Sequence, residues 1–276
     1  MGLLGSNFVK ALINKGEEVQ VWNRTFAKAE ALEAFGAKAF KSPAEAVKGA
    51  DIIHLTLKDD AAVNEVLALA SSGFKPRVAI IDHTTTSAAG AIERTKEWKA
   101  KGIIYLHAPV FMGPQNALES TGTMMLSGDQ DVIREFEPHL SLMTGKILNF
   151  GPEEGRAAGI KLMGNCFLVT FTAGLSDTLQ LAKSLGIPLS AVEALFGTWN
   201  PGAMLPARLK RMTSGDYSQP SWELNMARKD VGLFMEAAAH AGNELAVVPA
   251  IAEEMDRWIK EGHGQEDWTV IGSGSL

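Results

Sequence analysis

Short apolar runs alternate with amphipathic stretches along the first half of the chain, and this alternation limits the fold more than any other feature. Strand-like runs occupy residues 17–23, 38–40, 51–57, 78–84 and 103–110. Helical patterns fill the intervals at residues 6–15, 25–36, 42–50, 59–70 and 89–101. Strands that alternate with helices are typical of a parallel sheet with right-handed helical crossovers. The sequence therefore predicts an α/β fold, a Rossmann-type doubly wound parallel sheet, over residues 1–151.

The second half has helical patterns only. Residues 155–186 form one run without proline that is well above the usual helix length. Further helical patterns follow at residues 189–196, 204–212, 223–241 and 246–261. We expect an all-helical domain over residues 152–276, entered through a long inter-domain helix. The apolar stretch Ala157–Leu185 has more hydrophobic surface than such a domain buries alone, so we expect a homodimer formed through this domain.

The charge balance and residue counts exclude several functions. The chain has 26 Lys and Arg against 32 Asp and Glu, a net charge of −6, which argues against nucleic acid or an anionic membrane surface as partner. No apolar run approaches the length of a membrane span and no leader opens the chain, so we expect a cytoplasmic protein without a membrane partner. The single cysteine, Cys166, forms no internal disulfide. The six histidines lack metal-ligand spacing with one another or with Cys166, so we expect no metal site.

The opening "GLLGSNFVKALINKG" contains the second half of the dinucleotide fingerprint G-x-G-x-x-G. Gly2 would let the backbone approach a pyrophosphate, Gly5 would let the helix pack closely on the sheet, and the first helical N–H groups, around Leu3 and Leu4, would face the phosphates. A glycine-containing turn before an ordinary helix is the alternative. The strand and first glycine of the fingerprint are missing, and we expect about ten further residues to precede Met1 in the native chain.

Two segments that follow strand patterns carry polar side chains suited to a nicotinamide cofactor. "VQVWNRT" ends in Asn23, Arg24 and Thr25 where a site selective for NAD has a carboxylate, and a guanidinium with a hydroxyl favours the extra phosphate of NADP. In "IIDHTTTS", Thr84 and Thr85 follow a strand at the ligand-binding edge of an open sheet. The alternatives are helix caps, by Thr25 in the first segment and by a hydroxyl residue in the second.

Two lysines in the helical patterns are candidates for chemistry. Lys161 and Asn165 are four residues apart, so they share a helix face. A partly buried ammonium can donate a proton to the oxygen that becomes negative as hydride arrives, and the amide can orient that oxygen. Lys229, beside Asp230, reaches the cofactor in one interpretation and forms a surface ion pair in the other. A solvated Lys161 is likewise the alternative to a catalytic one.

The chain as a whole resembles the β-hydroxyacid dehydrogenase family, which includes 3-hydroxyisobutyrate and 6-phosphogluconate dehydrogenases and semialdehyde or glyoxylate reductases, with imine reductases more distant. The resemblance is carried by "GLLGSNFVKALINKG", "VWNRT", "IIDHTTT", "HAPVFMGPQNA", "GRAAGIKLMGN", "RKDVGL" and "DWTVI". It implies a Rossmann domain followed by a helical domain, assembled as a dimer or tetramer. It also implies that Lys161 is the catalytic lysine, Asn165 a substrate-binding asparagine, Lys229 a lysine near the cofactor, and Thr85 with Thr84 a hydroxyl pair near the nicotinamide.

One segment departs from the family pattern. Where the family reads D-x-P-V-S-G-G and binds a substrate carboxylate, this chain reads "HAPVFMG", with Phe111 and Met112 in place of serine and glycine. Gly113 remains, but Pro114 follows it and has no N–H group. We therefore expect Phe111, Met112 and Gly113 to line the site of a larger or more apolar carbonyl substrate.

The expected function is an NADP-dependent oxidoreductase that transfers hydride between nicotinamide and a small carbonyl or hydroxy compound. The substrate would be that of a 3-hydroxyacid dehydrogenase or of a semialdehyde or glyoxylate reductase, with Lys161 as the general acid or base. One alternative is an imine reductase acting on an apolar imine, although typical imine reductases replace the lysine with Asp or Tyr. The other is a catalytically idle cofactor-binding module, against which the presence of both Lys161 and Asn165 argues.

Overall fold

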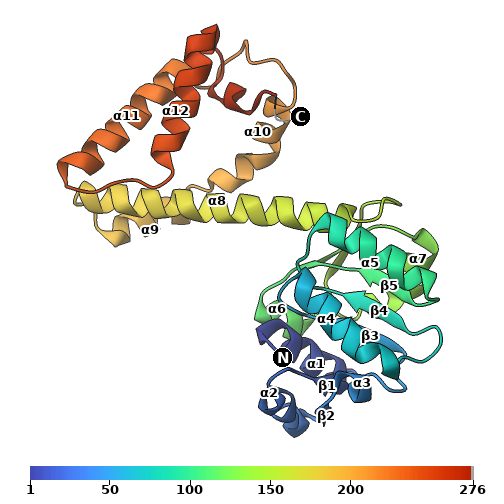
Figure 1. Ribbon diagram of the computed structural model, residues 1–276. Helices are drawn as coiled ribbons and strands as arrows, with labels where there is room; N and C mark the ends of the chain where they lie inside the picture. Colours follow the sequence, from blue (N-terminus) through green and yellow to red (C-terminus); the bar gives the residue numbers. More distant parts are fainter. Residues whose placement is uncertain (275–276) are drawn as a thin grey trace. The chain divides into compact units, whose positions relative to one another are not determined.

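The computed structural model describes residues 1–274. The chain divides into two compact units, Met1–Cys166 and Phe167–Leu276. The boundary lies inside the longest helix, α8 (Arg156–Ser184), so the first unit includes the opening turns of this helix (Figure 1). As expected, the first unit is α/β and the second is helical.

The first unit contains three small sheets. The strands are β1 (Gln20–Trp22) with β2 (Lys38–Phe40); β3 (Ile52–Leu55), β4 (Ala79–Asp82) and β5 (Ile104–His107); and β6 (Val110–Phe111), β7 (Thr123–Leu126) and β8 (Lys146–Asn149). Every pairing is parallel except that of β6 with β7. Within the described residues β1 is not paired with β3, so the sheet is interrupted between them. The expected strand before Met1 stays a prediction.

Helices connect these strands. They are α1 (Leu3–Asn14), α2 (Phe26–Glu30), η1 (Glu33–Phe35), α3 (Pro43–Ala46), α4 (Asp60–Ala70), η2 (Ser71–Gly73), α5 (Ala88–Ala100), α6 (Pro114–Glu119) and α7 (Gln130–Leu140). The single helix expected over residues 25–36 is instead split into α2 and η1. Between them the chain turns, and Leu32 is buried in a cluster with Val9 and Val21.

Both faces of the central sheet are covered by apolar side chains. Strand β4 is buried along its whole length, and its neighbouring residues point to opposite faces. Ile81 packs in a cluster with Phe8 of α1, whereas Ile80 packs in a second cluster with Leu67 of α4 and Trp98 of α5. A strand covered on both faces is characteristic of a doubly wound parallel sheet.

Up to residue 274, the second unit continues from α8 through seven further helical elements. They are α9 (Leu189–Thr198), η3 (Pro201–Met204), α10 (Leu205–Met212), α11 (Leu224–His240), α12 (Val248–Trp258), η4 (Ile259–His263) and η5 (Trp268–Gly272). In its described part the only β-pairing is one isolated bridge between Glu223 and Asp267.

Two buried carboxylates stabilise the second unit. Asp267 accepts hydrogen bonds from the N–H and hydroxyl of Ser221 and from those of Thr269, and it pairs with Arg211. Asp177 of α8 accepts from three successive backbone N–H groups, Ala246 to Val248, where α12 begins. Asp267, the first residue of "DWTVI", therefore has a structural role in this fold.

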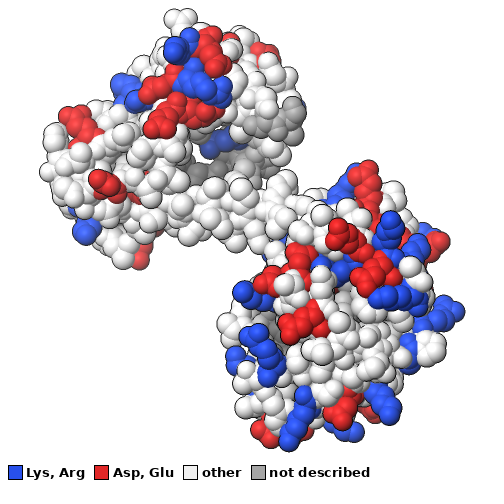
Figure 2. Space-filling view, viewed as in Figure 1, with Lys and Arg blue, Asp and Glu red and all other residues white. Residues whose placement is uncertain are grey.

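Helix α8 corrects one expectation. By length and composition alone this 29-residue helix is apolar enough to cross a membrane, so the expectation that no apolar run approaches that length is wrong. The reason is that residues 162–176 contain no charged side chain, while small residues and threonines interrupt the large apolar ones. Figure 2 shows the exposed middle of α8 almost without charge. Many of its apolar side chains are exposed, such as Val169 at 67%.

Candidate active site

The glycine pair has two distinct roles at the start of α1. A Cβ atom at Gly5 would overlap the hydroxyl of Thr56, which directly follows β3, so only glycine lets α1 approach this close. No atom lies within 4 Å of a Cβ placed at Gly2, the N-cap residue, so the space before the helix is open. The N–H groups of the first turn have no partner within the helix and attract anions. This end of α1, at Leu3 and Leu4, can therefore receive a phosphate group.

The segment after β1 presents a cation and no carboxylate. Arg24 is exposed and forms no ion pair within residues 1–274. The Asn23 side chain donates to the carbonyl oxygen of Thr25 at 2.9 Å, which fixes the turn. Thr25 is the N-cap residue of α2, but its side chain makes no capping hydrogen bond. The Arg24 guanidinium and the Thr25 hydroxyl thus remain available to a phosphate.

The hydroxyl residues after β4 have separate roles. Thr84 is buried, and its hydroxyl oxygen accepts the N–H of Leu57 at 3.0 Å, which joins the ends of β3 and β4. Ser87 is the cap of α5 and accepts the N–H of Gly90 at 3.0 Å. Thr85 is half-buried between them. The hydroxyl oxygen of Thr84 is thus committed to a backbone partner, and Thr85 remains the better candidate for a ligand contact.

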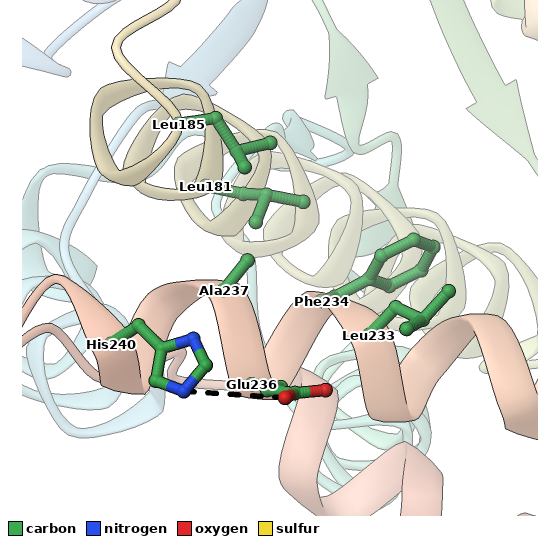
Figure 3. A pocket seen from close by; sticks show the side chains of 7 residues that line it. All are labelled: Leu181, Leu185, Leu233, Phe234, Glu236, Ala237 and His240. Carbon is green, nitrogen blue, oxygen red and sulfur yellow. Dashed lines mark ion pairs between the residues drawn. The ribbon is translucent and has the colours of Figure 1, made fainter.

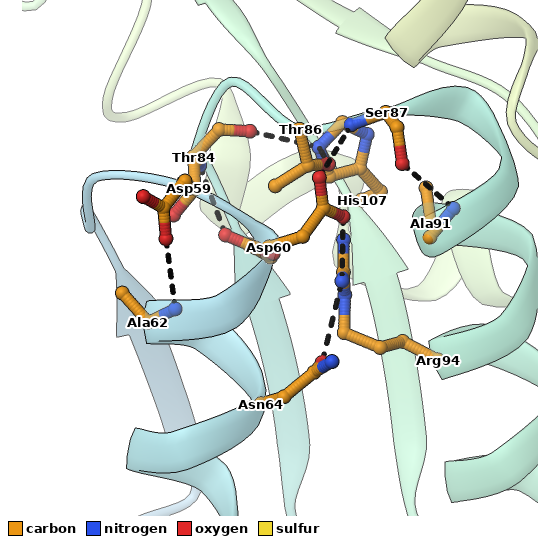
Figure 4. A network of polar contacts seen from close by, with 12 residues as sticks. Asp59, Asp60, Ala62, Asn64, Thr84, Thr86, Ser87, Ala91, Arg94 and His107 are labelled. Atoms are coloured by element: carbon orange, nitrogen blue, oxygen red, sulfur yellow. Dashed lines mark hydrogen bonds and ion pairs between the residues drawn. The ribbon is translucent and has the colours of Figure 1, made fainter.

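A buried polar network underlies this segment (Figure 4). Arg94 donates to Asp60 at 2.8 Å and to the hydroxyl of Tyr105 at 2.9 Å, and Tyr105 donates to Asp82 at 2.5 Å. Asp60 also accepts the N–H of Ser87 at 2.9 Å. Burial would raise the pKa of Asp60, but the hydrogen bonds from Ser87 and Arg94 outweigh it and hold the pKa below its usual value. The network therefore holds the loop in place through charge-assisted hydrogen bonds.

His107 supports the same loop from β5. Its Nε2 lies 2.9 Å from the carbonyl oxygen of Thr84 and 3.1 Å from the hydroxyl of Thr86. Burial lowers the pKa of His107, so the ring is neutral at pH 7 and donates from Nε2 to the carbonyl. Sequence patterns did not identify Asp60, Arg94, Tyr105 or His107, because their partners lie far apart along the chain.

Three further histidines form a hydrogen-bonded chain. His139 Nε2 lies 3.1 Å from His54 Nε2, His54 Nδ1 lies 3.0 Å from His83 Nε2, and His83 Nδ1 lies 2.8 Å from the carbonyl oxygen of Ala108. Because the carbonyl only accepts, neutral rings donate in one direction, from His139 to His54 to His83. Burial lowers the pKa of His83 to about 4. Among residues 1–274 no group of His, Cys, Asp or Glu is arranged to hold a metal ion.

Lys161 lies against an aromatic ring. Its Nζ is 4.0 Å from the centroid of the Phe111 ring, and its side chain is half-buried. Burial lowers the pKa of Lys161 below its usual value. Asn165 is half-buried one turn further along α8, as the shared helix face predicts. A half-buried ammonium with a lowered pKa is suited to proton transfer.

The segment after β6 offers few hydrogen-bond donors. The N–H of Gly113 donates to the side-chain oxygen of Asn116 at 2.9 Å, and Pro114 has no N–H group. Met112 packs against the apolar cluster that includes Phe8 and Met124. Only Phe111 among the three expected substrate-binding residues contacts Lys161.

Lys229 belongs to the second unit. It lies on α11 and forms an ion pair with Asp230, with Nζ and Oδ1 2.8 Å apart. Its expected contact with the cofactor stays a prediction.

The second unit also has an apolar hollow of about 410 Å³ (Figure 3). It is lined by Leu181, Leu185, Leu233, Phe234, Glu236, Ala237 and His240. None of the expected cofactor or substrate residues is among them, so this hollow is not the candidate active site.

Comparisons with known proteins agree with these features. Residues 1–151 match the family model of the NAD-binding domain of 6-phosphogluconate dehydrogenase. An oxidoreductase of Synechocystis sp. is 30% identical over 86% of this chain and 83% of its own length. The 2-(hydroxymethyl)glutarate dehydrogenase of Eubacterium barkeri is 25% identical over 98% of this chain and 91% of its own length.

A solved structure shares the architecture of both units. An imine reductase from Myxococcus stipitatus in complex with NADP+ has a TM-score of 0.91 and 22% sequence identity, covering 98% of this chain and 96% of that one. At this identity the likeness shows the fold alone.

Proposed function

The chain belongs to the family defined by the NAD-binding domain of 6-phosphogluconate dehydrogenase, and we propose that within it this protein is an NADPH-dependent reductase of an apolar carbonyl compound. It is an NAD(P)-dependent oxidoreductase of the hydroxyacid dehydrogenase family, whose curated relatives are dehydrogenases and reductases. The observation that carries the finer proposal is the half-buried Lys161 on α8, beside the apolar Phe111.

The preference for NADPH rests on the segment after β1. The pyrophosphate would be held by the open end of α1 at Gly2, with the N–H groups of Leu3, Leu4 and Gly5. The additional phosphate of NADPH would be bound by Arg24 and Thr25, since no carboxylate in residues 23–25 repels it. Thr85 would lie near the nicotinamide, at the carboxyl end of β4.

Lys161 is the general acid in this proposal. The nicotinamide, when bound, supplies a hydride to the carbonyl carbon. The Lys161 ammonium donates a proton to the oxygen that becomes negative, and the lowered pKa of this lysine makes the transfer easier. Asn165, one turn along α8, donates a hydrogen bond that orients the same oxygen. Lys229 would contact the cofactor from α11.

The assembly is proposed to be a homodimer formed through the helical unit, in the cytoplasm. The support is the exposed apolar surface of α8, which includes Phe167, Leu168 and Phe171. A surface of this kind is costly to leave in water and marks an interface.

A turnover panel tests the function. NADPH and NADH would each be combined with neutral aldehydes and ketones, 2-oxo acids, ω-semialdehydes and cyclic imines, and oxidation of the cofactor would be followed by absorbance. We expect the fastest oxidation with NADPH and a neutral carbonyl compound. A clear preference for the imines would indicate that the protein is an imine reductase instead. No oxidation of the cofactor with any member of the panel would refute the proposed function.

A further inference from the structure

The Phe111 ring and Lys161 fit each other because residue 164 has no side chain. Gly164 lies three residues after Lys161, hence on the same face of α8. A Cβ atom at this position would overlap the Cζ and approach the Cε atoms of the Phe111 ring. The glycine therefore leaves a notch in α8 that the ring fills, and the ring face is then 4.0 Å from the Lys161 Nζ. An ammonium over an aromatic face is attracted by the ring quadrupole.

The surroundings of this pair contain little that could bind a carboxylate. Phe111 and Met112 have no side-chain donor, the N–H of Gly113 is used by Asn116, and Pro114 has no N–H. Among these residues only Lys161 carries a positive charge. A substrate carboxylate would have to pair with that ammonium, which would stabilise the protonated lysine and remove it from the carbonyl oxygen.

We propose that Phe111 is the specificity-determining residue of this site: its ring positions the Lys161 ammonium, and its lack of a hydrogen-bond donor restricts the substrate to carbonyl compounds that bear no carboxylate. The proposal rests on the proposed function, because it deepens the account of the same site. Phe111 is a positioning residue, since it acts on the reaction through Lys161. Gly164 is the position that makes this arrangement possible.

The position of the ring can be measured without turnover. In protein with ¹³C-labelled lysine, the Lys161 signal is assigned by its loss in Lys161→Arg. The ring face should shift the Lys161 Cε protons upfield, and this shift should disappear in Phe111→Leu, which stays apolar. Gly164→Ala should reduce the shift, because the added methyl group displaces the end of the ring.

The chain offers a matched control. The Lys10 Nζ lies 4.1 Å from the centroid of the Phe35 ring, so Phe35→Leu removes an equivalent pair outside the site. This variant should leave the Lys161 signal unchanged. A Lys161 signal that is the same in the wild type and in Phe111→Leu would overturn the positioning role.

Specificity is tested with hexanoate and hexanamide, titrated into the labelled protein saturated with NADPH. We expect hexanamide to shift the Lys161 signal without changing the pH at which this signal titrates, whereas hexanoate should raise that pH, because its carboxylate has no partner but the ammonium. In Phe111→Ser the added hydroxyl can bind the carboxylate, so hexanoate should raise that pH less. A hexanoate-induced shift of the wild-type signal with no change in its titration would refute the specificity role.

The second part of the specificity test measures the turnover of hexanal and of 6-oxohexanoate. The wild-type kcat/KM should favour hexanal by about tenfold or more, and Phe111→Ser should narrow this ratio mainly through the KM of the acid. Phe111→Leu should keep the ratio but lower kcat for hexanal. If the wild type reduces neither these compounds nor any member of the panel, the proposed function fails, while the lysine signals still decide the role of Phe111. A wild-type ratio near one refutes the specificity role alone.

Discussion

The chemistry assigned to Lys161 follows from its surroundings. Lys161 and Lys183 lie on the same helix, but Lys183 is exposed in the last turn, whereas Lys161 is half-buried beside Phe111 and has a lowered pKa. Because the developing alkoxide needs a proton, Lys161→Ala should lower turnover about 10²–10⁴-fold. The affinity for NADPH, measured by fluorescence titration, should barely change.

Lys183→Ala is the control for this prediction and should keep normal turnover. Near-normal turnover of Lys161→Ala on a substrate found in the panel would show that another group donates the proton.

A second prediction for a single residue concerns Arg24. A charge-assisted contact to the additional phosphate of NADPH is worth about 1.5–3 kcal/mol, or roughly ten- to a hundredfold in affinity. Arg24→Ala should therefore remove most of the preference for NADPH over NADH, measured as the ratio of the two dissociation constants. Lys28→Ala removes an exposed cation of α2 and should keep the preference. Equal wild-type affinities for the two cofactors would contradict the prediction.

The role of a single residue was predictable where it follows from a short sequence motif. Gly5 was expected to permit close packing, and its contact with Thr56 confirms this. The hydroxyl run after β4 was expected either to face a ligand or to cap a helix. In the structure Ser87 caps α5, whereas Thr84 has a third role and accepts the N–H of Leu57. The ion pair of Asp60 with Arg94 joins two helices, and no spacing along the chain indicates it.

At the scale of elements, hydrophobic periodicity predicted the presence of helices and strands better than their ends. The long run at residues 155–186 became α8 almost to the residue, and the five strand patterns became β1 to β5. Boundaries were too wide: the helix expected at 42–50 is α3 of four residues, because the chain bends after Val47. Strand β6 has two residues, too few to show an alternating pattern, and pairs with β7 antiparallel.

The histidine chain ties four segments together and makes their stability depend on pH. The folded state holds the pKa of His83 near 4, because the ring is buried, below the unfolded value near 6.5. The unfolded state therefore binds more protons between these values, so stability is present above pH 6.5 and is lost as pH falls toward 4. We expect His83 alone to lower the free energy of unfolding by about 2 kcal/mol between pH 7 and pH 5.

Urea unfolding at the two pH values measures this loss. The carboxylates with lowered pKa values, such as Asp60, titrate below this window and do not contribute. His83→Gln should be less stable at pH 7 but should show a smaller loss on going to pH 5, whereas the exposed His240→Gln should behave as wild type. Equal losses in wild type and His83→Gln would contradict the prediction.

For the whole molecule, the distribution of charge and apolar surface is the main feature. The net charge of −6 is carried by side chains outside the middle of α8, since residues 162–176 have none. The exposed apolar residues of that stretch include Met163, Phe167, Leu168, Val169 and Phe171. Exposed apolar side chains that follow one another along a helix in this way are more than a monomer normally leaves in water. The sequence indicated its hydrophobic character but not its exposure, which depends on what the fold packs against it.

A second copy of the chain is the proposed cover for this surface, in a two-fold symmetric homodimer. The wild type should therefore be a dimer at micromolar concentration by light scattering. Val169→Asp would bury an unpaired charge in each copy, at a cost of about 3–5 kcal/mol, so dissociation should become easier by roughly a hundredfold or more. Leu69→Asp is the matched control, because Leu69 of α4 is 55% exposed against 67% for Val169 and lies in the first unit. A monomeric wild type, or a Val169→Asp variant as tightly dimeric as Leu69→Asp, would show that α8 is not the interface.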